Sequence, residues 1–206
     1  KQRRDENRGN DPADLQYEVT WIGDWFTLPG ETLDPTLVSN DFIDGGADVL
    51  ISGIDTTEAI TVAGQRAAAG ETVWAVPYDY RQACDTAPEV CLGVPYFNWA
   101  PPYLAIAESV ADGTYEATFQ WLAPAWDQID DSETTPVGIL KGAALDPEDE
   151  AALDAFIAGL ADGSINLWTG PLNLQDGTAW LAEGETATEQ QIWFTEQLLE
   201  GIEGAS

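Results

Sequence analysis

The sequence predicts an α/β fold built around a mainly parallel sheet. Three short apolar runs, residues 17–23, 49–53 and 72–78, have the length and composition of buried strands. Two helical patterns, residues 35–44 and 57–69, lie between them. Strand–helix–strand alternation in this order is typical of parallel strands joined by crossover helices. Because crossover helices cover a parallel sheet, we expect helices on both of its faces.

Polar and aromatic residues follow each of the three apolar runs. These clusters are residues 24–26, 54–56 and 79–82. In open α/β sheets, ligands bind in the crevice beyond the carboxyl ends of the strands. The sequence therefore predicts one composite binding site, formed by the three clusters together.

The second half of the chain continues with shorter elements. The Pro101–Pro102 pair suits the first turn of a helix over 103–111, and an Asp–Gly pair ends that helix. A second Asp–Gly pair ends an amphipathic helix over 146–161. We also expect strands at 90–94, 118–122 and 137–140, a two-stranded unit made of 165–168 and 179–181, and a last helix at 188–199.

The charge of the chain excludes several classes of partner. The 206 residues hold 37 acidic and 7 basic side chains and no histidine, a formal net charge of −30. Four of the bases stand within the first eight residues, which leaves 3 bases and 35 acids from Gly9 onward. A nucleic-acid partner is excluded because phosphate binding needs a basic surface, and an acidic partner or an anionic membrane is disfavoured by charge repulsion. Because the chain has two lysines and its acids are spread evenly, these acids are typical of a solvated shell in a salt-rich habitat. A cation-binding role is the alternative, but no loop has the spacing of a calcium site.

The two cysteines, Cys84 and Cys91, enclose six residues. A disulfide between them would close an eight-residue loop, worth about 2.5 kcal/mol by the chain-entropy estimate. Such a bond indicates an oxidising compartment, whereas two reduced structural thiols are the alternative. The sequence contains no run of 18 apolar residues, so it predicts no membrane span. The chain begins at Lys1 without a signal peptide, as expected of a mature or trimmed product.

Five motifs carry a family resemblance. They are Trp-Ile-Gly-Asp-Trp-Phe at 21–26, Phe-Ile-Asp-Gly-Gly-Ala-Asp-Val at 42–49, Ala-Val-Pro-Tyr-Asp-Tyr-Arg-Gln at 75–82, Gly-Pro-Leu at 170–172 with Asp-Gly at 176–177, and Gly-Glu at 184–185 with the terminal 200–204. In this order, over about residues 10–204, the chain resembles the substrate-binding proteins of the basic membrane protein family. These proteins are the purine-nucleoside receptors of ABC importers.

The resemblance implies one lobe of a type I periplasmic-binding-protein-like fold, in which two α/β lobes are joined by a hinge. Only the second part of such a receptor resembles this chain, so a missing N-terminal lobe would lie in the same or another chain. On this interpretation residues 1–10 are a remnant or tail. Residues 11–95 form the ligand-binding lobe, and 96–206 form a hinge-crossing segment with the remaining elements. A natural single-lobe protein is the alternative.

The function implied is an extracytoplasmic solute-binding protein that delivers a nucleoside-like ligand to an ABC permease. Its precursor would be lipid-anchored, and it would be no enzyme and hold no cofactor or metal. A single-lobe sensory or surface-scaffold protein is one alternative. A carbohydrate-active enzyme is another, because nine tryptophans and many carboxylates suit sugar binding.

Four candidate ligand-binding residues follow from strand ends and from the resemblance. Phe26 is the expected base-stacking ring, with Trp25 shaping the wall, although both rings would pack under the following helix in the alternative interpretation. Asp79 matches the family's ribose-binding carboxylate, which suits a vicinal diol, or it is a plain surface aspartate. Gly53 would let a ligand approach the backbone, or it is a turn glycine.

Trp99 and Arg81 are two further candidates, and near Trp99 the sequence differs from the pattern of the family. Purine-nucleoside receptors commonly carry a lysine just after the strand corresponding to 90–94, where this chain has Tyr96-Phe97-Asn98-Trp99. Trp99 would contact the ligand or brace the hinge. Arg81 would pair with Asp79 or reach an anionic group of the ligand. The departure weakens the inference to purine nucleosides specifically.

Overall fold

The structure, a computed structural model, describes residues 15–204. These residues form two compact units. The larger unit is residues 22–161, and the smaller unit combines 15–21 with 162–204. Each unit is described by itself below.

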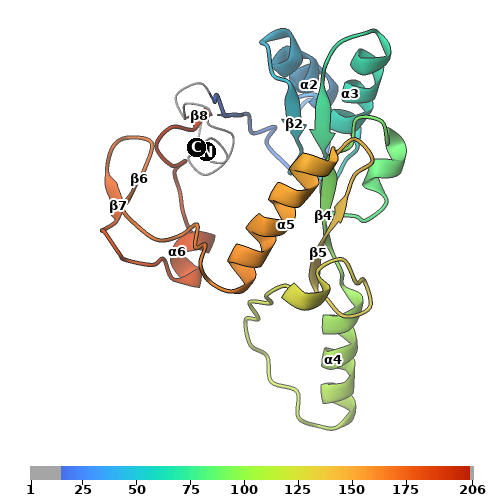
Figure 1. The fold of residues 1–206 in the computed structure, drawn as a ribbon. Helices are drawn as coiled ribbons and strands as arrows, with labels where there is room; N and C mark the ends of the chain where they lie inside the picture. Colours follow the sequence, from blue (N-terminus) through green and yellow to red (C-terminus); the bar gives the residue numbers. More distant parts are fainter. Residues whose placement is uncertain (1–14, 205–206) are drawn as a thin grey trace. The chain divides into compact units, whose positions relative to one another are not determined.

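The larger unit is an α/β structure whose strands are mostly parallel. Strands β2 (Val49–Ile51) and β3 (Trp74–Val76) pair in parallel. Parallel bridges Ala75↔Cys91 and Asp79↔Tyr96 join β3 to the next strand, β4 (Gly93–Phe97). Strand β5 (Val137–Lys141) pairs with β4 in antiparallel register. The order is therefore β2–β3–β4–β5, and the predicted α/β class is confirmed (Figure 1).

Two helices cover the parallel part of this unit. Helix α2 (Pro35–Asp44) begins where the Asp34 carboxylate accepts a hydrogen bond from the Thr36 amide at 2.8 Å, an N-cap that satisfies an otherwise unpaired donor. Helix α3 (Glu58–Ala68) packs against α2, β2 and β3. Its apolar face supplies the centre of the core, where Ile60, Val62 and Ala63 pack with Ile43, Leu50, Val73, Ala75, Ala87, Val90 and Cys91.

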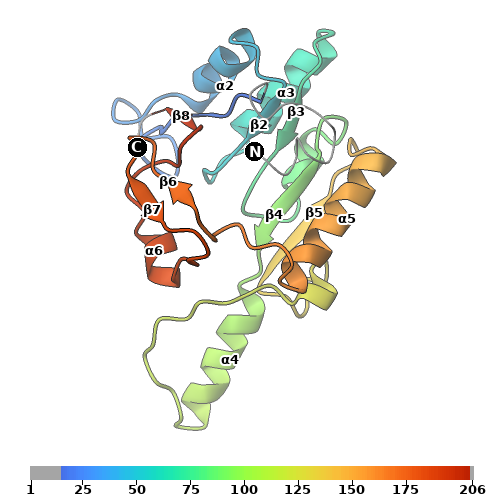
Figure 2. The ribbon, with the colours of Figure 1, turned by 60° about the vertical axis from the view of Figure 1, so that its left-hand side comes forward.

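The other helices of this unit lie apart from the α2–α3 pair. Helix α5 (Pro147–Ala161) runs alongside β4 and β5 in both views (Figures 1 and 2). Lys141 at the end of β5 bonds to Glu150 and Asp154 of α5 at 2.9 and 2.6 Å. Helix α4 (Ala100–Ala111) continues from the end of β4 and points away from the strands (Figure 2). Short 3₁₀ turns lie at Ala83–Thr86 (η2) and Trp126–Gln128 (η3).

The smaller unit contains short strands and one short helix. Strand β1 (Glu18–Val19) pairs in parallel with β8 (Glu203–Gly204). Strand β6 (Leu172–Asn173) pairs antiparallel with β7 (Ala179–Leu181). The turn between them has Gly177 at φ 83°, a conformation that glycine adopts without steric cost. Helix α6 (Glu189–Trp193) begins at a capping box formed by Thr188 and Gln191.

Two predicted strands are absent and a third is shorter than expected. Of residues 17–23, only Glu18–Val19 is a strand, because Gly23 at φ 108° turns the chain and the Asp24 carboxylate accepts from the Trp25 amide. The prediction of a strand at 165–168 is wrong, because the Asn166 side chain accepts from the Trp168 amide and forms a turn. Its place beside β7 is taken by β6. Residues 118–122 form no strand either, although their apolar and polar residues alternate.

Other boundaries differ by a few residues. Strand β4 begins three residues later than the predicted start at 90, while Cys91 makes a single bridge to β3. Helix α4 begins three residues earlier than predicted and includes both prolines in its first turn. The last helix, predicted at 188–199, ends at Trp193. Beyond it, Leu199 forms a bridge with Leu174, so the chain there is extended.

Within residues 15–204, no helix is long and apolar enough to cross a membrane. The predicted tail at 1–10 lies outside the described residues. The predicted division at 95/96 stays a prediction.

Candidate functional site

The loops after β2 and β3 meet the loop at 24–26 in the larger unit. The Asp55 amide donates to the Trp25 carbonyl at 2.7 Å, which joins the first cluster to the second. The charge of Asp55 also acts on Tyr78 and Asp79, which follow β3. The structure therefore brings the three clusters together, although the first follows a bend rather than a strand.

Asp79 has an unusual backbone conformation. Its φ is 81°, which makes it the one non-glycine residue of the described chain in the left-handed region. Aspartate and asparagine tolerate this region better than other side chains, yet the conformation still costs roughly 1–3 kcal/mol. The Asp79 amide donates to the Pro95 carbonyl at 3.2 Å, and its carbonyl accepts from Phe97 at 2.9 Å. The pairing with β4 thus holds Asp79 in place, and strain of this kind is concentrated at functional sites.

The carboxyl group of Asp79 is partly desolvated. Burial raises its pKa above the ordinary value, and the neighbouring charge of Asp55 raises it further. The pKa of the Tyr78 phenol is raised by burial first and then by Asp55 and Asp79. A carboxylate in these surroundings gains from hydrogen-bond donors such as hydroxyl groups, which replace the water that burial removes.

A row of aromatic rings begins beside Asp79. The Tyr78 and Phe97 centroids are 5.7 Å apart in an edge-to-face arrangement. Phe97 lies 5.6 Å from Trp99, and Trp99 stacks on Tyr103 at 5.8 Å. The row therefore runs from the end of β3, across the end of β4, to the first turn of α4. Trp99 is 56% exposed, so its ring leaves a wide apolar surface open to a planar ligand.

Trp25 and Phe26 are also exposed at this edge. Trp25 is 61% exposed and Phe26 is 49% exposed, so neither ring is buried beneath the following helix. Gly53, two residues after β2, has open space where a side chain would stand, because a Cβ there would meet nothing within 4 Å. Its backbone is accessible, as close approach by a ligand requires.

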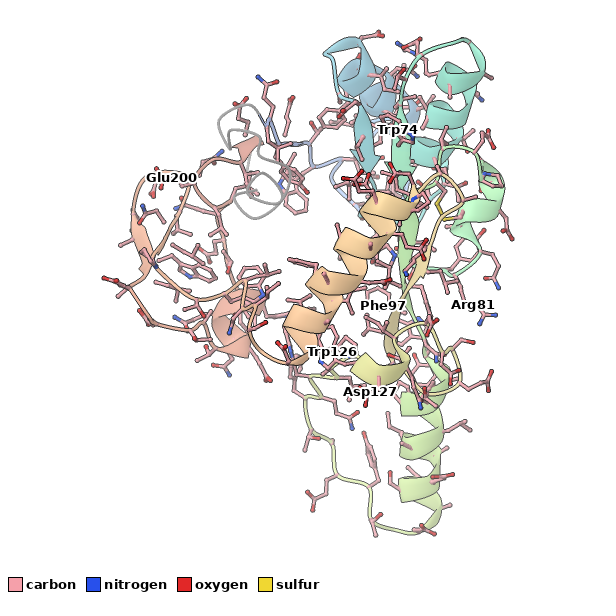
Figure 3. All side chains as sticks on the ribbon, in the orientation of Figure 1. Trp74, Arg81, Phe97, Trp126, Asp127 and Glu200 are labelled. Atoms are coloured by element: carbon pink, nitrogen blue, oxygen red, sulfur yellow. A yellow bond between two sulfur atoms is a disulfide. The ribbon has the colours of Figure 1, made fainter. Side chains whose placement is uncertain are left out.

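Arg81 lies in a groove at the ends of β3 and β4, and it does not pair with Asp79. The groove has a volume of about 370 Å³ and is lined by Arg81 together with Tyr80, Tyr96, Phe97, Leu104 and Glu133. The Arg81 guanidinium donates to the Ser132 hydroxyl. Figure 3 shows Arg81 and Phe97 at the same level of the molecule, near the end of β4 from which α4 continues.

Asn98, which lines this groove, and the disulfide each connect segments that are separate in the sequence. The Asn98 amide group donates to the carbonyls of Ser132 and of Thr135, the latter at 2.9 Å. Cys84 and Cys91 form a disulfide that ties the turn after Arg81 to the residues leading into β4. The disulfide predicted from the cysteine spacing is therefore present.

Several residues of this site escaped the sequence reasoning. Asp55 and Tyr78 stand beside Asp79, and Phe97 and Tyr103 extend the aromatic row. Asp55 belonged to a predicted cluster, but nothing in its local sequence distinguishes it from the other acids. Tyr103 is four residues from Trp99, a spacing that brings side chains together on a helix and would have indicated the contact.

Comparison with known proteins finds similarity between this chain and two binding proteins. No family model matches the chain. A purine-binding protein of Brucella abortus (strain 2308) is 30% identical over 185 residues, which are 87% of this chain and 46% of the relative. An ABC transporter solute-binding protein from Conexibacter woesei DSM 14684 has a TM-score of 0.49 and 22% identity over 80% of this chain and 50% of that protein.

The similarity to the purine-binding protein confirms the resemblance seen in the motifs, since it extends over most of the chain. The chain spans about half the length of the proteins it matches.

Proposed function

We propose that this chain is part of an extracytoplasmic solute-binding protein of an ABC importer, related to the basic membrane protein family. Its ligand is a purine nucleoside or a related heterocycle, bound between two lobes. One observation carries the proposal: the strained Asp79 lies at the carboxyl ends of the strands beside exposed aromatic rings. The similarity to a purine-binding protein supports the same ligand class.

Each candidate residue has a role in this proposal. Phe26 stacks on the base, and Trp25 forms the adjoining wall. Asp79 accepts hydrogen bonds from ribose hydroxyls, and Gly53 lets the ligand approach the backbone. Trp99 closes the apolar side of the site. Pockets for flat ligands commonly combine apolar faces with a few oriented polar groups, which is the combination found here.

The exposed surface of α4 supports the proposal that a further lobe completes the cleft. No residue of α4 is buried. Leu104 is 63% exposed, and Tyr103 and Val110 are similarly exposed. Adjacent exposed apolar side chains on one helix indicate an interaction surface. A lobe supplied by a longer chain would cover this surface, and closure of the two lobes would signal to the permease.

The disulfide supports an extracytoplasmic location, because such bonds persist in oxidising compartments. Lipid anchoring of the precursor belongs to the same proposal. Binding and release by lobe closure require no catalytic group, so we propose no enzymatic activity.

The substitution Asp79→Ala tests the proposed ribose contact. In the protein encoded by the complete gene, we expect at least a tenfold loss of affinity for inosine, because a charged hydrogen-bond acceptor contributes about 1.5–3 kcal/mol. Affinity for hypoxanthine, which lacks ribose, should change little. Isothermal titration calorimetry measures both, with Asp162→Ala as a control at an exposed carboxylate. Unchanged affinity for inosine would remove Asp79 from the site.

A further inference from the structure

Arg81 is the one basic side chain within residues 15–204 that forms no ion pair with a described carboxylate. Arg66 bonds to Asp44 at 2.6 Å and to Glu71 at 2.7 Å. Lys141 bonds to Glu150 and Asp154. Arg81, in contrast, donates to the neutral hydroxyl of Ser132. The other two cations are therefore held by pairs of carboxylates, and Arg81 is not.

An arginine without a carboxylate is unexpected in so acidic a chain. The protein holds 37 acidic side chains, and Glu133 lines the same groove as Arg81. A guanidinium has five N–H donors in a planar fork, and the bond to Ser132 leaves most of them available. Side chains that bind a ligand are often left without internal partners, because the ligand supplies them.

The position of Arg81 near the candidate site suggests a ligand for its unpaired N–H donors. Arg81 follows Asp79 by two residues, and the disulfide ties the next turn to the approach to β4. Phe97 lines the groove beside Arg81 and also contacts Tyr78, next to Asp79. Arg81 and Phe97 lie at the same level of the molecule (Figure 3), and Phe97 connects the groove to Tyr78, the neighbour of Asp79.

We propose that Arg81 reads the oxygen-bearing edge of a 6-oxopurine, such as hypoxanthine or guanine. This inference rests on the proposed function and names its ligand class more closely. The fork of an arginine matches the O6 and N7 acceptors of an oxopurine. Adenine presents an amino group at the same position, where two donors would face each other. Arg81 is thus a specificity-determining residue, distinct in role from the ribose-binding Asp79.

A phosphate group is the other ligand chemistry that an arginine fork fits. Electrostatics favours the oxopurine. Asp55 and Asp79 lie on the same edge, and Glu133 lines the groove. A phosphate dianion held at Arg81 would be repelled by these carboxylates, whereas a neutral base with an acceptor edge would not.

The test compares hypoxanthine with adenine by calorimetry on the protein encoded by the complete gene. We expect hypoxanthine to bind at least about tenfold more tightly, since a bidentate pair of this kind discriminates by about 1–3 kcal/mol. Arg81→Gln should abolish or reverse the preference, because it weakens hypoxanthine and a glutamine side chain can pair with the N6 and N7 atoms of adenine. Arg81→Lys keeps the charge but loses the fork, so it should restore only a small part of the preference and also serves if Arg81→Gln folds poorly.

Lys141→Gln is the matched control, because it removes the same charge from a cation held by α5. It should leave the preference unchanged. Inosine monophosphate, compared with inosine at low and high salt, separates the two ligand chemistries. Tighter, salt-sensitive binding of the monophosphate would assign Arg81 to phosphate and overturn the oxopurine proposal.

The remaining outcomes separate this inference from the proposed function. Equal affinities for hypoxanthine and adenine would overturn the inference alone, as would an equal loss of both ligands in Arg81→Gln. Failure of every purine base and nucleoside to bind would overturn the proposed function, and the inference with it.

Discussion

The region around α3 and the region around α4 belong to the same unit but are packed in opposite ways. Ile60 and Ala63 of α3 are fully buried against β2 and β3. Helix α4 carries Tyr103, Leu104 and Val110, which are as apolar, and none of its residues is buried. Helical propensity and an apolar face are therefore present in both regions. The difference lies in whether a sheet is available to cover that face.

This contrast predicts very different costs for similar substitutions. Ile60→Ala removes buried methyl groups from a filled core and should cost about 2–5 kcal/mol. Leu104→Ala, on the exposed face of α4, should change stability by less than about 0.5 kcal/mol in the 206-residue chain. Urea denaturation followed by fluorescence measures both. Similar costs for the two variants would show that α4 is covered in solution.

The disulfide extends the comparison between the α3 and α4 regions, because Cys91 belongs to the core that packs against α3. Replacing Cys84 and Cys91 together by serine should cost about 2.5 kcal/mol, the entropy of closing an eight-residue loop in the unfolded chain. The loss should also loosen the turn that carries Arg81. Denaturation midpoints of the oxidised protein and the double variant test this directly. A midpoint shift below that of Leu104→Ala would contradict the stabilising role.

A smaller effect, of opposite sign to the loss of the disulfide, is expected at Asp79. Burial and Asp55 raise its pKa, so the folded state holds the carboxyl proton more tightly than the unfolded state does. Ionisation therefore opposes folding, and this penalty develops as the pH rises above the ordinary aspartate pKa. Asp79→Asn removes the penalty and also tolerates the left-handed backbone, so it should stabilise the protein at neutral pH by less than about 1 kcal/mol.

A control with the reverse behaviour is Asp162→Asn. Hydrogen bonds from Ser164 lower the pKa of Asp162, so its contribution to stability is present at neutral pH and lost as the pH falls through the folded-state value. We expect the gain of Asp79→Asn and the loss of Asp162→Asn both to vanish in acid. Denaturation midpoints at neutral and acidic pH measure the two, and a destabilised Asp79→Asn would contradict the strain and repulsion assigned to this position.

The sequence predicted best where local signals suffice. Helix α2 has its predicted bounds because Asp34 caps it and Pro35 begins it. Strands need partners, and a partner cannot be read from a local pattern. Residues 118–122 alternate as a strand does, yet they form none in the described structure. Residues 165–168 form a local turn at Asn166 instead of the predicted strand, although their apolar residues are typical of a strand.

In the candidate site, too, some residues could be predicted from local sequence and others depend on tertiary structure. Strand ends pointed to Asp79 and Gly53 because a polar or small residue lies there at the end of an apolar run, whereas Trp99 was predicted from the family resemblance. The proximity of Asp55 to Asp79 and the bond of Arg81 to Ser132, 51 residues away, are products of tertiary structure. The spacing of Asp79 and Arg81 suggested an ion pair, whereas the structure directs Arg81 into the groove beside Phe97.

Native mass spectrometry of the protein encoded by the complete gene, purified without added ligand, tests the central claim most directly. The account predicts a mass well above the 22.2 kDa of this chain and a co-purified purine nucleoside or related heterocycle. A mass of 22.2 kDa with no bound heterocycle, and no purine retained on addition, would contradict a two-lobed purine receptor.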